Sequence, residues 1–150
     1  MVTLDIGCGS NKFNKRAIGV DVVKSEGVDV VADVIDLHMY SSDSIDIVFC
    51  RRTITHVEDD HTAIREIARI LNSSGLAVIE VGSWWNGIIY SLKYCRGKDR
   101  YLWHFYTPIK FKRLLEKNGL KVIQLGTIWT WRPWRMFRNY VAVCIKGETV

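Results

Sequence analysis

The sequence lacks the features that mark membrane-spanning, secreted, disulfide-stabilised and zinc-stabilised proteins. No apolar run is long enough to cross a bilayer, and the segment Met1–Gly9 does not have the basic and then apolar layout of a secretory signal. The four cysteines are widely scattered and form no C-x-x-C pair. We therefore expect a cytoplasmic protein with no integral membrane segment and no bound metal.

Internal repeats and low-complexity segments are also missing, and the composition is that of one globular domain. The chain has 150 residues, of which 48% are apolar and 25% charged. The net charge is +5, but residues 1–92 carry eight Lys and Arg against thirteen Asp and Glu, whereas residues 93–138 carry twelve against two. An acidic half joined to a basic half indicates separate tasks for the two.

Short runs rich in Val and Ile alternate with turn signals through the first half. They predict four strands, and their composition is typical of parallel strands covered on both faces. The predicted strands are residues 2–6, 17–21, 28–32 and 45–50. Apolar residues at helical spacing predict a helix over Thr62–Leu71, with a stop signal at 72–75 and a fifth strand at 76–81.

The last third predicts a helix and a hairpin. Thr107 and Pro108 supply a cap and a first-turn proline, so we expect a helix over 107–118. Residues 121–128 and 139–146 are predicted to be two strands joined by a short aromatic loop. This order of elements indicates an α/β fold with a mainly parallel sheet and an antiparallel C-terminal hairpin.

The most informative segment is Leu4–Gly9 (LDIGCG), in which a predicted strand runs into a Gly-x-Gly turn. Glycines at such a turn let the backbone approach a ligand closely. The third glycine of the dinucleotide-binding pattern is missing, because Lys12 occupies its position. Asp5 lies two residues before Gly7, where a carboxylate repels a pyrophosphate but suits a cofactor that carries an ammonium group.

LDIGCG resembles the first motif of the class I S-adenosylmethionine-dependent methyltransferases. IGVD, ending at Asp21, resembles the second motif and Asp33-Val34 the third, while residues 44–81 resemble the fourth strand, its helix and the fifth strand. Residues 105–146 match more loosely. The resemblance implies a single domain with a three-layer Rossmann-like fold. Its parts would be a cofactor-binding half (1–81), a lid or substrate insertion (82–106), and a C-terminal helix and hairpin (107–150).

The resemblance also implies S-adenosylmethionine as cofactor and gives the matching positions roles. Asp5 would hold the turn and favour the ammonium group, Asp21 would accept both ribose hydroxyls, and Asp33 would accept from the adenine amino group. Arg51 would line the far side of the cofactor through its backbone. The implied cofactor-binding residues are Asp5, Gly7, Cys8, Gly9, Asp21, Val22, Asp33, Val34 and Arg51.

Candidates for the substrate side follow the fourth strand and precede the late helix. His56 is a candidate general base, with a structural place in the wall of the site as the alternative. Arg52, His104 and Tyr106 are candidate substrate-binding residues, with surface charge or packing as the alternatives.

The sequence also bears on partners. Family members usually carry helices before the first strand, and here that strand begins at Met1 or Val2. We therefore expect a short form covered by residues 82–106 or by a partner, with a truncated chain as the alternative. Trp129, Trp131 and Trp134 lie beside arginines in a segment suited to nucleic acid, a lipid interface or another chain. A homo-oligomer or a protein partner is therefore predicted. Lys93, Arg96, Lys98 and Arg100 are predicted to ring the entrance of the site, with a plain solvated face as the alternative.

These observations predict a methyltransferase that transfers a methyl group by in-line displacement to an anionic small molecule or a nucleic acid. A non-catalytic scaffold or cofactor-binding partner protein is the alternative. A nicotinamide-dependent oxidoreductase is disfavoured by Lys12 and Asp5.

Overall fold

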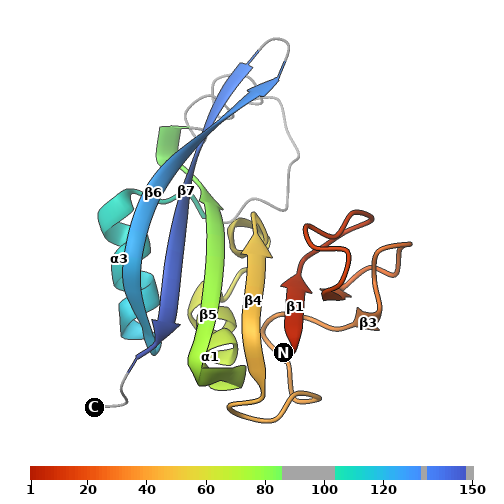
Figure 1. Ribbon diagram of the computed structural model, residues 1–150. Helices are drawn as coiled ribbons and strands as arrows, with labels where there is room; N and C mark the ends of the chain where they lie inside the picture. Colours follow the sequence, from red (N-terminus) through yellow and green to blue (C-terminus); the bar gives the residue numbers. More distant parts are fainter. Residues whose placement is uncertain (86–103, 133–134, 148–150) are drawn as a thin grey trace.

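The computed structural model describes residues 1–85, 104–132 and 135–147; for residues 130–132 and 135–137 it describes the backbone. Seven strands form one sheet in the order β3-β2-β1-β4-β5-β7-β6 (Figure 1). The strands are β1 (Thr3–Ile6), β2 (Ile18–Asp21), β3 (Val30–Val31), β4 (Ile45–Arg51), β5 (Leu71–Gly82), β6 (Leu120–Arg132) and β7 (Arg135–Lys146).

The pairing confirms the predicted fold class. Strands β1 to β5 pair in parallel, whereas β7 pairs antiparallel with both β5 and β6. The hairpin of β6 and β7 extends well past the carboxyl ends of β1 and β4 (Figure 1). The order reverses between β1 and β4, and such a switch point is where open α/β sheets bind their ligands.

The two helices begin at residues whose side chains cap them. In α1 (Asp60–Ile70) the Asp59 carboxylate accepts from the Thr62 backbone N–H at 2.9 Å. In α3 (Pro108–Lys117) the Thr107 hydroxyl accepts from the Lys110 N–H at 3.2 Å. Both helices were predicted, with ends shifted by one or two residues.

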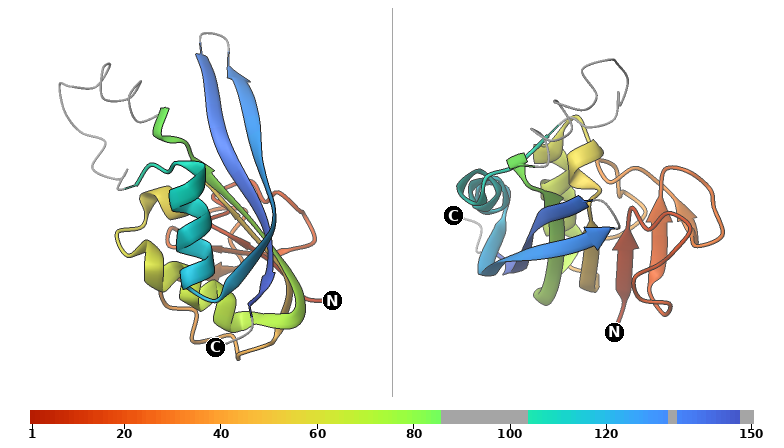
Figure 2. Two further views of the ribbon diagram at one scale, coloured as in Figure 1. Left: turned by 90° about the vertical axis from the view of Figure 1, so that its left-hand side faces the viewer. Right: turned by 90° about the horizontal axis from the view of Figure 1, so that it is seen from above.

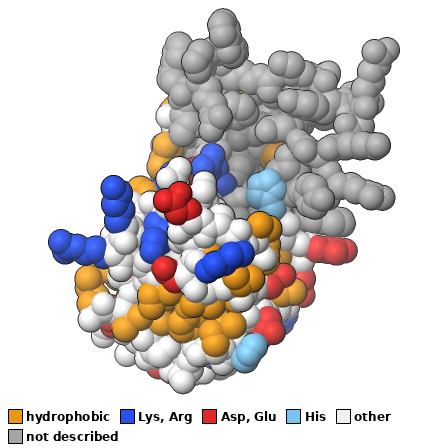
Figure 3. Space-filling model, turned by 90° about the vertical axis from the view of Figure 1, so that its right-hand side faces the viewer, with side chains coloured by type: hydrophobic (Ala, Val, Ile, Leu, Met, Phe, Trp, Pro, Cys, Tyr) orange, Lys and Arg blue, Asp and Glu red, His pale blue; other side chains and the backbone are white. Residues whose placement is uncertain are grey.

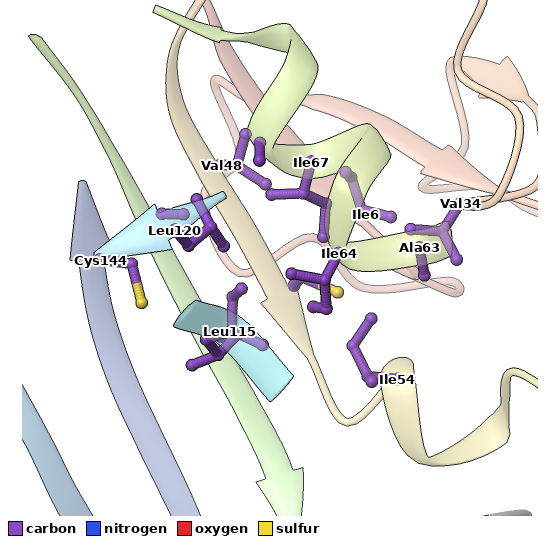
Figure 4. Packing of buried hydrophobic residues seen from close by; sticks show 14 of the residues in the cluster. Ile6, Val34, Val48, Ile54, Ala63, Ile64, Ile67, Leu115, Leu120 and Cys144 are labelled. Carbon is purple, nitrogen blue, oxygen red and sulfur yellow. The ribbon is translucent and has the colours of Figure 1, made fainter. Parts of the chain in front are cut away.

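The α-helices α1 and α3 lie on the same face of the sheet (Figure 2), and a short 3-10 helix, η1 (Ile54–His56), follows β4. The two α-helices enclose the hydrophobic core, in which α1 contributes Ile64 and Ile67 and α3 contributes Leu115 (Figure 4). Val34, from the connection between β3 and β4, joins the same core. The strands were expected to be covered on both faces, and the described helices cover one.

Several strands differ in length from the predictions. Val28–Ala32 shrinks to β3 because Asp29 bends away to accept from Gly19 N–H at 2.8 Å and Lys12 at 2.7 Å. The expected stop at 72–75 lies inside β5, whose register shifts beside it. The expected aromatic loop of the hairpin is largely strand, since Trp, Thr and Ile favour extended backbone.

The chain leaves the sheet after β5 and returns to the same point before α3. Ser83 forms a parallel bridge with Tyr106, and the Trp84 N–H donates to the Tyr106 carbonyl at 2.8 Å. Much of the predicted insertion 82–106 lies outside the described residues. Within the described ranges, no helix is long and apolar enough to cross a membrane.

Candidate functional site

The Gly-x-Gly turn follows β1 and is pressed against the end of β4. Gly7 has φ +70°, and its N–H donates to the Val20 carbonyl at 2.7 Å. A Cβ at Gly7 would lie 1.8 Å from Thr53 Oγ1, which itself donates to the Ile6 carbonyl at 3.1 Å. Only glycine therefore lets the turn approach the residue that follows β4 so closely.

Gly9 serves a different purpose in the same turn. It has φ +55°, and an added Cβ would meet nothing within 4 Å, so its Cα faces open space. The Gly9 N–H donates to Asp21 Oδ2 at 2.9 Å, while Asp21 Oδ1 accepts from the Val23 N–H at 3.0 Å. Because each carboxylate oxygen accepts two hydrogen bonds, Asp21 keeps acceptor capacity for a ligand.

Asp5 is 3% exposed and holds the segment after the turn, because its carboxylate accepts from the Phe13 backbone N–H. Burial raises the pKa of Asp5, while the hydrogen bond from Phe13 and the charge of Arg51 partly offset that rise. The Phe13 ring packs 5.1 Å from the ring of Phe49, and the Arg51 guanidinium lies 4.5 Å from the Phe13 centroid. Asp5 thus holds the segment that follows the Gly-x-Gly turn.

The carboxyl ends of the first four strands border a cavity of about 720 Å³, a usual size for a small-molecule site. It is lined by Ile6, Gly7, Asp21, Val22, Ala32, Asp33, Val34, Ile35, Arg51, Arg52, Thr53, His56, Val57, Glu58 and Asp59.

The charges of this cavity suit a ligand with cationic groups. Four lining residues are acidic, Asp21, Asp33, Glu58 and Asp59, whereas two are basic, Arg51 and Arg52. S-adenosylmethionine carries a sulfonium, an ammonium and one carboxylate, so its net positive charge fits. The open space beside Gly9 leaves room for the part of this cofactor that lies close to the protein backbone.

The cavity brings most of the predicted site residues together. Of the implied cofactor set, Gly7, Asp21, Val22, Asp33, Val34 and Arg51 line it. Asp5, Cys8 and Gly9 support the turn without being part of the lining. On the substrate side, Arg52 and His56 line the cavity as well. Their roles stay predictions.

His104 and Tyr106 are placed elsewhere. Tyr106 is fully buried, and its hydroxyl donates to Asp60 Oδ2 at 2.7 Å. His104 Nε2 lies 3.0 Å from the Glu58 carbonyl oxygen and 3.9 Å from Asp60 Oδ2. In this arrangement both residues join the start of α1 to the strand bridge, and neither is part of the cavity wall.

Sequence reasoning missed several lining residues. Glu58 and Asp59 line the cavity, and their place close to His56 in the sequence was the available signal. Thr53 gave no signal, since its importance comes from contact with Gly7, which is distant in the sequence. Ile6, Ala32, Ile35 and Val57 complete the missed set.

The edge of the sheet next to the cavity is unusually apolar. Figure 3 views the molecule from the β3 side and shows hydrophobic side chains gathered there. Val22, Val23 and Val31 are exposed in this part of the chain, and Val22 also lines the cavity.

The described cysteines are poor candidates for chemistry. Burial raises the pKa of the Cys50 and Cys144 thiols to about 12, which keeps both protonated near neutral pH. Burial and the charges of Asp5 and Asp21 also raise the pKa of Cys8. No cluster of metal-ligating side chains occurs among the residues that the structure describes.

Comparisons with known proteins agree with this geometry. A family model described as a methyltransferase domain matches residues 1–125. A search of curated proteins finds no significant match to the sequence.

Solved structures resemble the chain over nearly its whole length. A Methanosarcina mazei S-adenosylmethionine-dependent methyltransferase has a TM-score of 0.77 at 16% identity, covering 98% of this chain and 92% of that one. The Burkholderia thailandensis 1,6-didemethyltoxoflavin-N1-methyltransferase, bound to its substrate and S-adenosylhomocysteine, scores 0.73 at 15% identity, covering 98% and 71%. A chain in the complex of the Haloferax volcanii Trm112 methyltransferase activator with a methyltransferase scores 0.74 at 18% identity, covering 99% and 83%. At these identities the likeness shows the fold.

Proposed function

The chain belongs to the methyltransferase domain family, and from that premise we propose that it is an enzyme that transfers the methyl group of S-adenosylmethionine to an acceptor bound in the same cavity. The observation that carries this proposal is that Asp21, Asp33 and Gly9 lie together at the carboxyl ends of adjacent strands, where Gly9 faces open space. Two carboxylates there can accept from a ribose and an adenine amino group.

The chemistry needs binding and orientation more than it needs a catalytic side chain. The bound cofactor supplies an electrophilic methyl group. The glycine turn and Asp21 would hold one end of it, and the walls at Arg52 and Val57 would hold the acceptor in line with the methyl carbon. His56 would take a proton from an acceptor that arrives protonated.

The acceptor would occupy the end of the cavity formed by Arg52, His56 and Glu58. Arg52 has φ +59°, and its backbone N–H donates to the Glu80 carbonyl at 2.7 Å, so its position is fixed by strand β5. Its exposed side chain lines the cavity, and a guanidinium there supports the prediction of an anionic small molecule or a nucleic acid. Lys93, Arg96, Lys98 and Arg100 lie outside the described residues. The cytoplasmic location stays a prediction.

Replacement of Asp21 by alanine tests cofactor binding. Two charge-assisted hydrogen bonds to the ribose would be lost, so we expect S-adenosylmethionine affinity to fall on the order of 100-fold by calorimetry. Glu26→Ala is the matched control, because it removes the same charge from the same connection at an exposed position away from the lining. Unchanged affinity in folded Asp21→Ala would contradict the proposal.

Methyl transfer itself needs a separate measurement. Incubating the protein with labelled S-adenosylmethionine and a cell extract should place label in one class of acceptor. His56→Ala should slow this transfer more than it weakens cofactor binding. Cofactor binding without transfer to any fraction would favour the non-catalytic alternative.

A further inference from the structure

The connection between β1 and β2 has a single apolar side chain to hold it. Residues 10–16 have the sequence SNKFNKR, in which Phe13 is the only apolar residue, and they form no helix (Figure 1). The Phe13 N–H donates to the Asp5 carboxylate, and the residue is 58% exposed. The conformation of the chain after the Gly-x-Gly turn therefore depends on the contacts of this one ring.

Two side chains of β4 contact the Phe13 ring. Phe49 and Arg51 are two residues apart, so they share a face of the sheet with Asp5, which pairs with Phe49. This face lies opposite the core that contains Val48. The Phe49 ring centroid lies 5.1 Å from that of Phe13, and the guanidinium carbon of Arg51 lies 4.5 Å from the Phe13 centroid, within the range of a cation–π contact.

Glu80 of β5 fixes the orientation of Arg51. The two residues are partners in the strand register, and Arg51 Nε donates to Glu80 Oε2 at 3.0 Å. The second carboxylate oxygen, Oε1, accepts from Asn139 Nδ2 of β7 at 2.7 Å. Glu80 and Asn139 are each only 4% exposed, so little water competes for the carboxylate and the ion pair is weakly screened. The guanidinium is thus held in place from β5 and β7.

These contacts connect the strand β7 of the hairpin to the segment that follows the glycine turn. We propose that Glu80 is a positioning residue for cofactor binding, an inference that rests on the proposed function. It fixes Arg51 over Phe13 and thereby holds the chain after the turn in the conformation that binds S-adenosylmethionine. Neither Glu80 nor Phe13 lines the cavity, whereas Arg51 does, so both act on the ligand through other residues.

Glu80→Gln tests this role, because the amide keeps the size of the side chain. One of the two donors, Arg51 or Asn139, would then face an NH₂ group instead of an acceptor oxygen. We expect calorimetry on the whole chain to show about 10-fold weaker S-adenosylmethionine binding. Asp43→Asn is the matched control. It removes the same charge from an ion pair with Lys146 of β7, away from the cavity lining, and asparagine tolerates the φ of +59° there.

A double-mutant cycle with Phe13→Leu distinguishes positioning from a general loss of stability. Phe13 is exposed, so this variant should fold, and losing the ring face should weaken cofactor binding by a similar factor. Because both substitutions disturb the same guanidinium, the double variant should bind only about 10-fold more weakly than the wild type. Independent effects would multiply to roughly 100-fold.

Hydrogen exchange measured by NMR gives a readout that needs no cofactor. The Phe13 amide is bonded to Asp5, and its exchange reports how often the segment opens. In Glu80→Gln this amide should exchange about 10-fold faster relative to the amides inside α3. A loss of global stability alone would accelerate both together.

Circular dichroism would establish that each variant is folded. If Glu80→Gln does not fold, Arg51→Lys replaces it in the cycle, since lysine keeps the charge but not the flat group over Phe13. Unchanged affinity in folded Glu80→Gln, losses that multiply in the double variant, or Phe13 exchange that only follows α3 would each overturn the positioning role. A wild-type protein that binds no S-adenosylmethionine contradicts the proposed function, whereas faster Phe13 exchange in Glu80→Gln would still show that Glu80 holds this segment.

Discussion

The first 44 residues and the rest of the chain are held together by different means. In residues 1–44 aspartate side chains fix the connections between strands. Asp5 binds the Phe13 N–H, Asp21 binds the N–H groups after β1 and β2, and Asp29 binds Gly19 and Lys12. No helix occurs in this part of the chain, all of which the structure describes.

From residue 45 onward, the chain is held together by helices and by the packing of apolar side chains. Helices α1 and α3 bury Ile64, Ile67, Phe111 and Leu115 against β4, β5 and β7. Although the first region has less apolar burial and is less than a third of the chain, it supplies eight of the fifteen residues that line the cavity. Backbone N–H groups fixed by carboxylates leave the ends of the strands open to a ligand, whereas helices would cover them.

Leu115→Ala should have the largest effect on stability. It removes buried contacts from α3, so we expect unfolding free energy to fall by about 3–5 kcal/mol in denaturant titrations. Cofactor affinity of the protein that remains folded should be unchanged, because Leu115 is absent from the cavity lining. A parallel loss of affinity would show that the two regions are not separable.

Gly7→Ala should damage the first region by a smaller amount. The added Cβ overlaps Thr53 and sits on a left-handed backbone, which together cost about 2–4 kcal/mol. Gly9→Ala is the comparison, since its Cβ meets no protein atom and only the backbone cost, about 1 kcal/mol, applies. We expect Gly9→Ala to reduce S-adenosylmethionine affinity out of proportion to its stability loss. If the two variants lost the same affinity for each unit of stability lost, this would argue against a ligand lying beside Gly9.

Asp5→Asn should have the smallest effect, visible as a change with pH. The pKa of Asp5 in the folded protein lies above the ordinary 3.8, so its favourable contribution is present at low pH and is lost as pH rises through the folded-state value. Asn keeps an acceptor for Phe13 without a charge. As pH rises through the acidic range, the unfolding free energy of the variant should therefore increase relative to that of the wild type.

Asp36→Asn is the control with the opposite sign. A hydrogen bond from His38 lowers the pKa of Asp36, so its contribution is present above pH 3.8 and is lost as pH falls. The variant should lose stability relative to the wild type as pH rises. Identical pH profiles for both variants would contradict the burial of Asp5.

Much of the fold could be predicted from the sequence, because its signals are local. Thr107-Pro108 and the Val- and Ile-rich runs each determine their own element. The limits of β3 and β5 could not be predicted, since they depend on Asp29 reaching Gly19 and on Leu71 pairing with Ile45, both distant in the chain. The amino-acid sequence alone does not reveal such long-range contacts.

The site divides in the same way. Asp21 and Asp33 were predicted because motif and strand end coincide, and the cavity contains both. Thr53 could not be predicted, because its place in the site depends on a contact with Gly7, which is distant in the sequence. Trp131, Trp134, Arg132 and Arg135 lie outside the described side chains.

The bridge between Ser83 and Tyr106 has a consequence for protein engineering. Because the Tyr106 N–H donates to Gly82 at 3.3 Å and the Trp84 N–H donates back at 2.8 Å, the two ends of the intervening chain are fastened beside each other. The entropy of closing a loop between fixed ends grows only slowly with its length. This position can therefore accept segments of different length and composition while the seven-stranded sheet stays as it is.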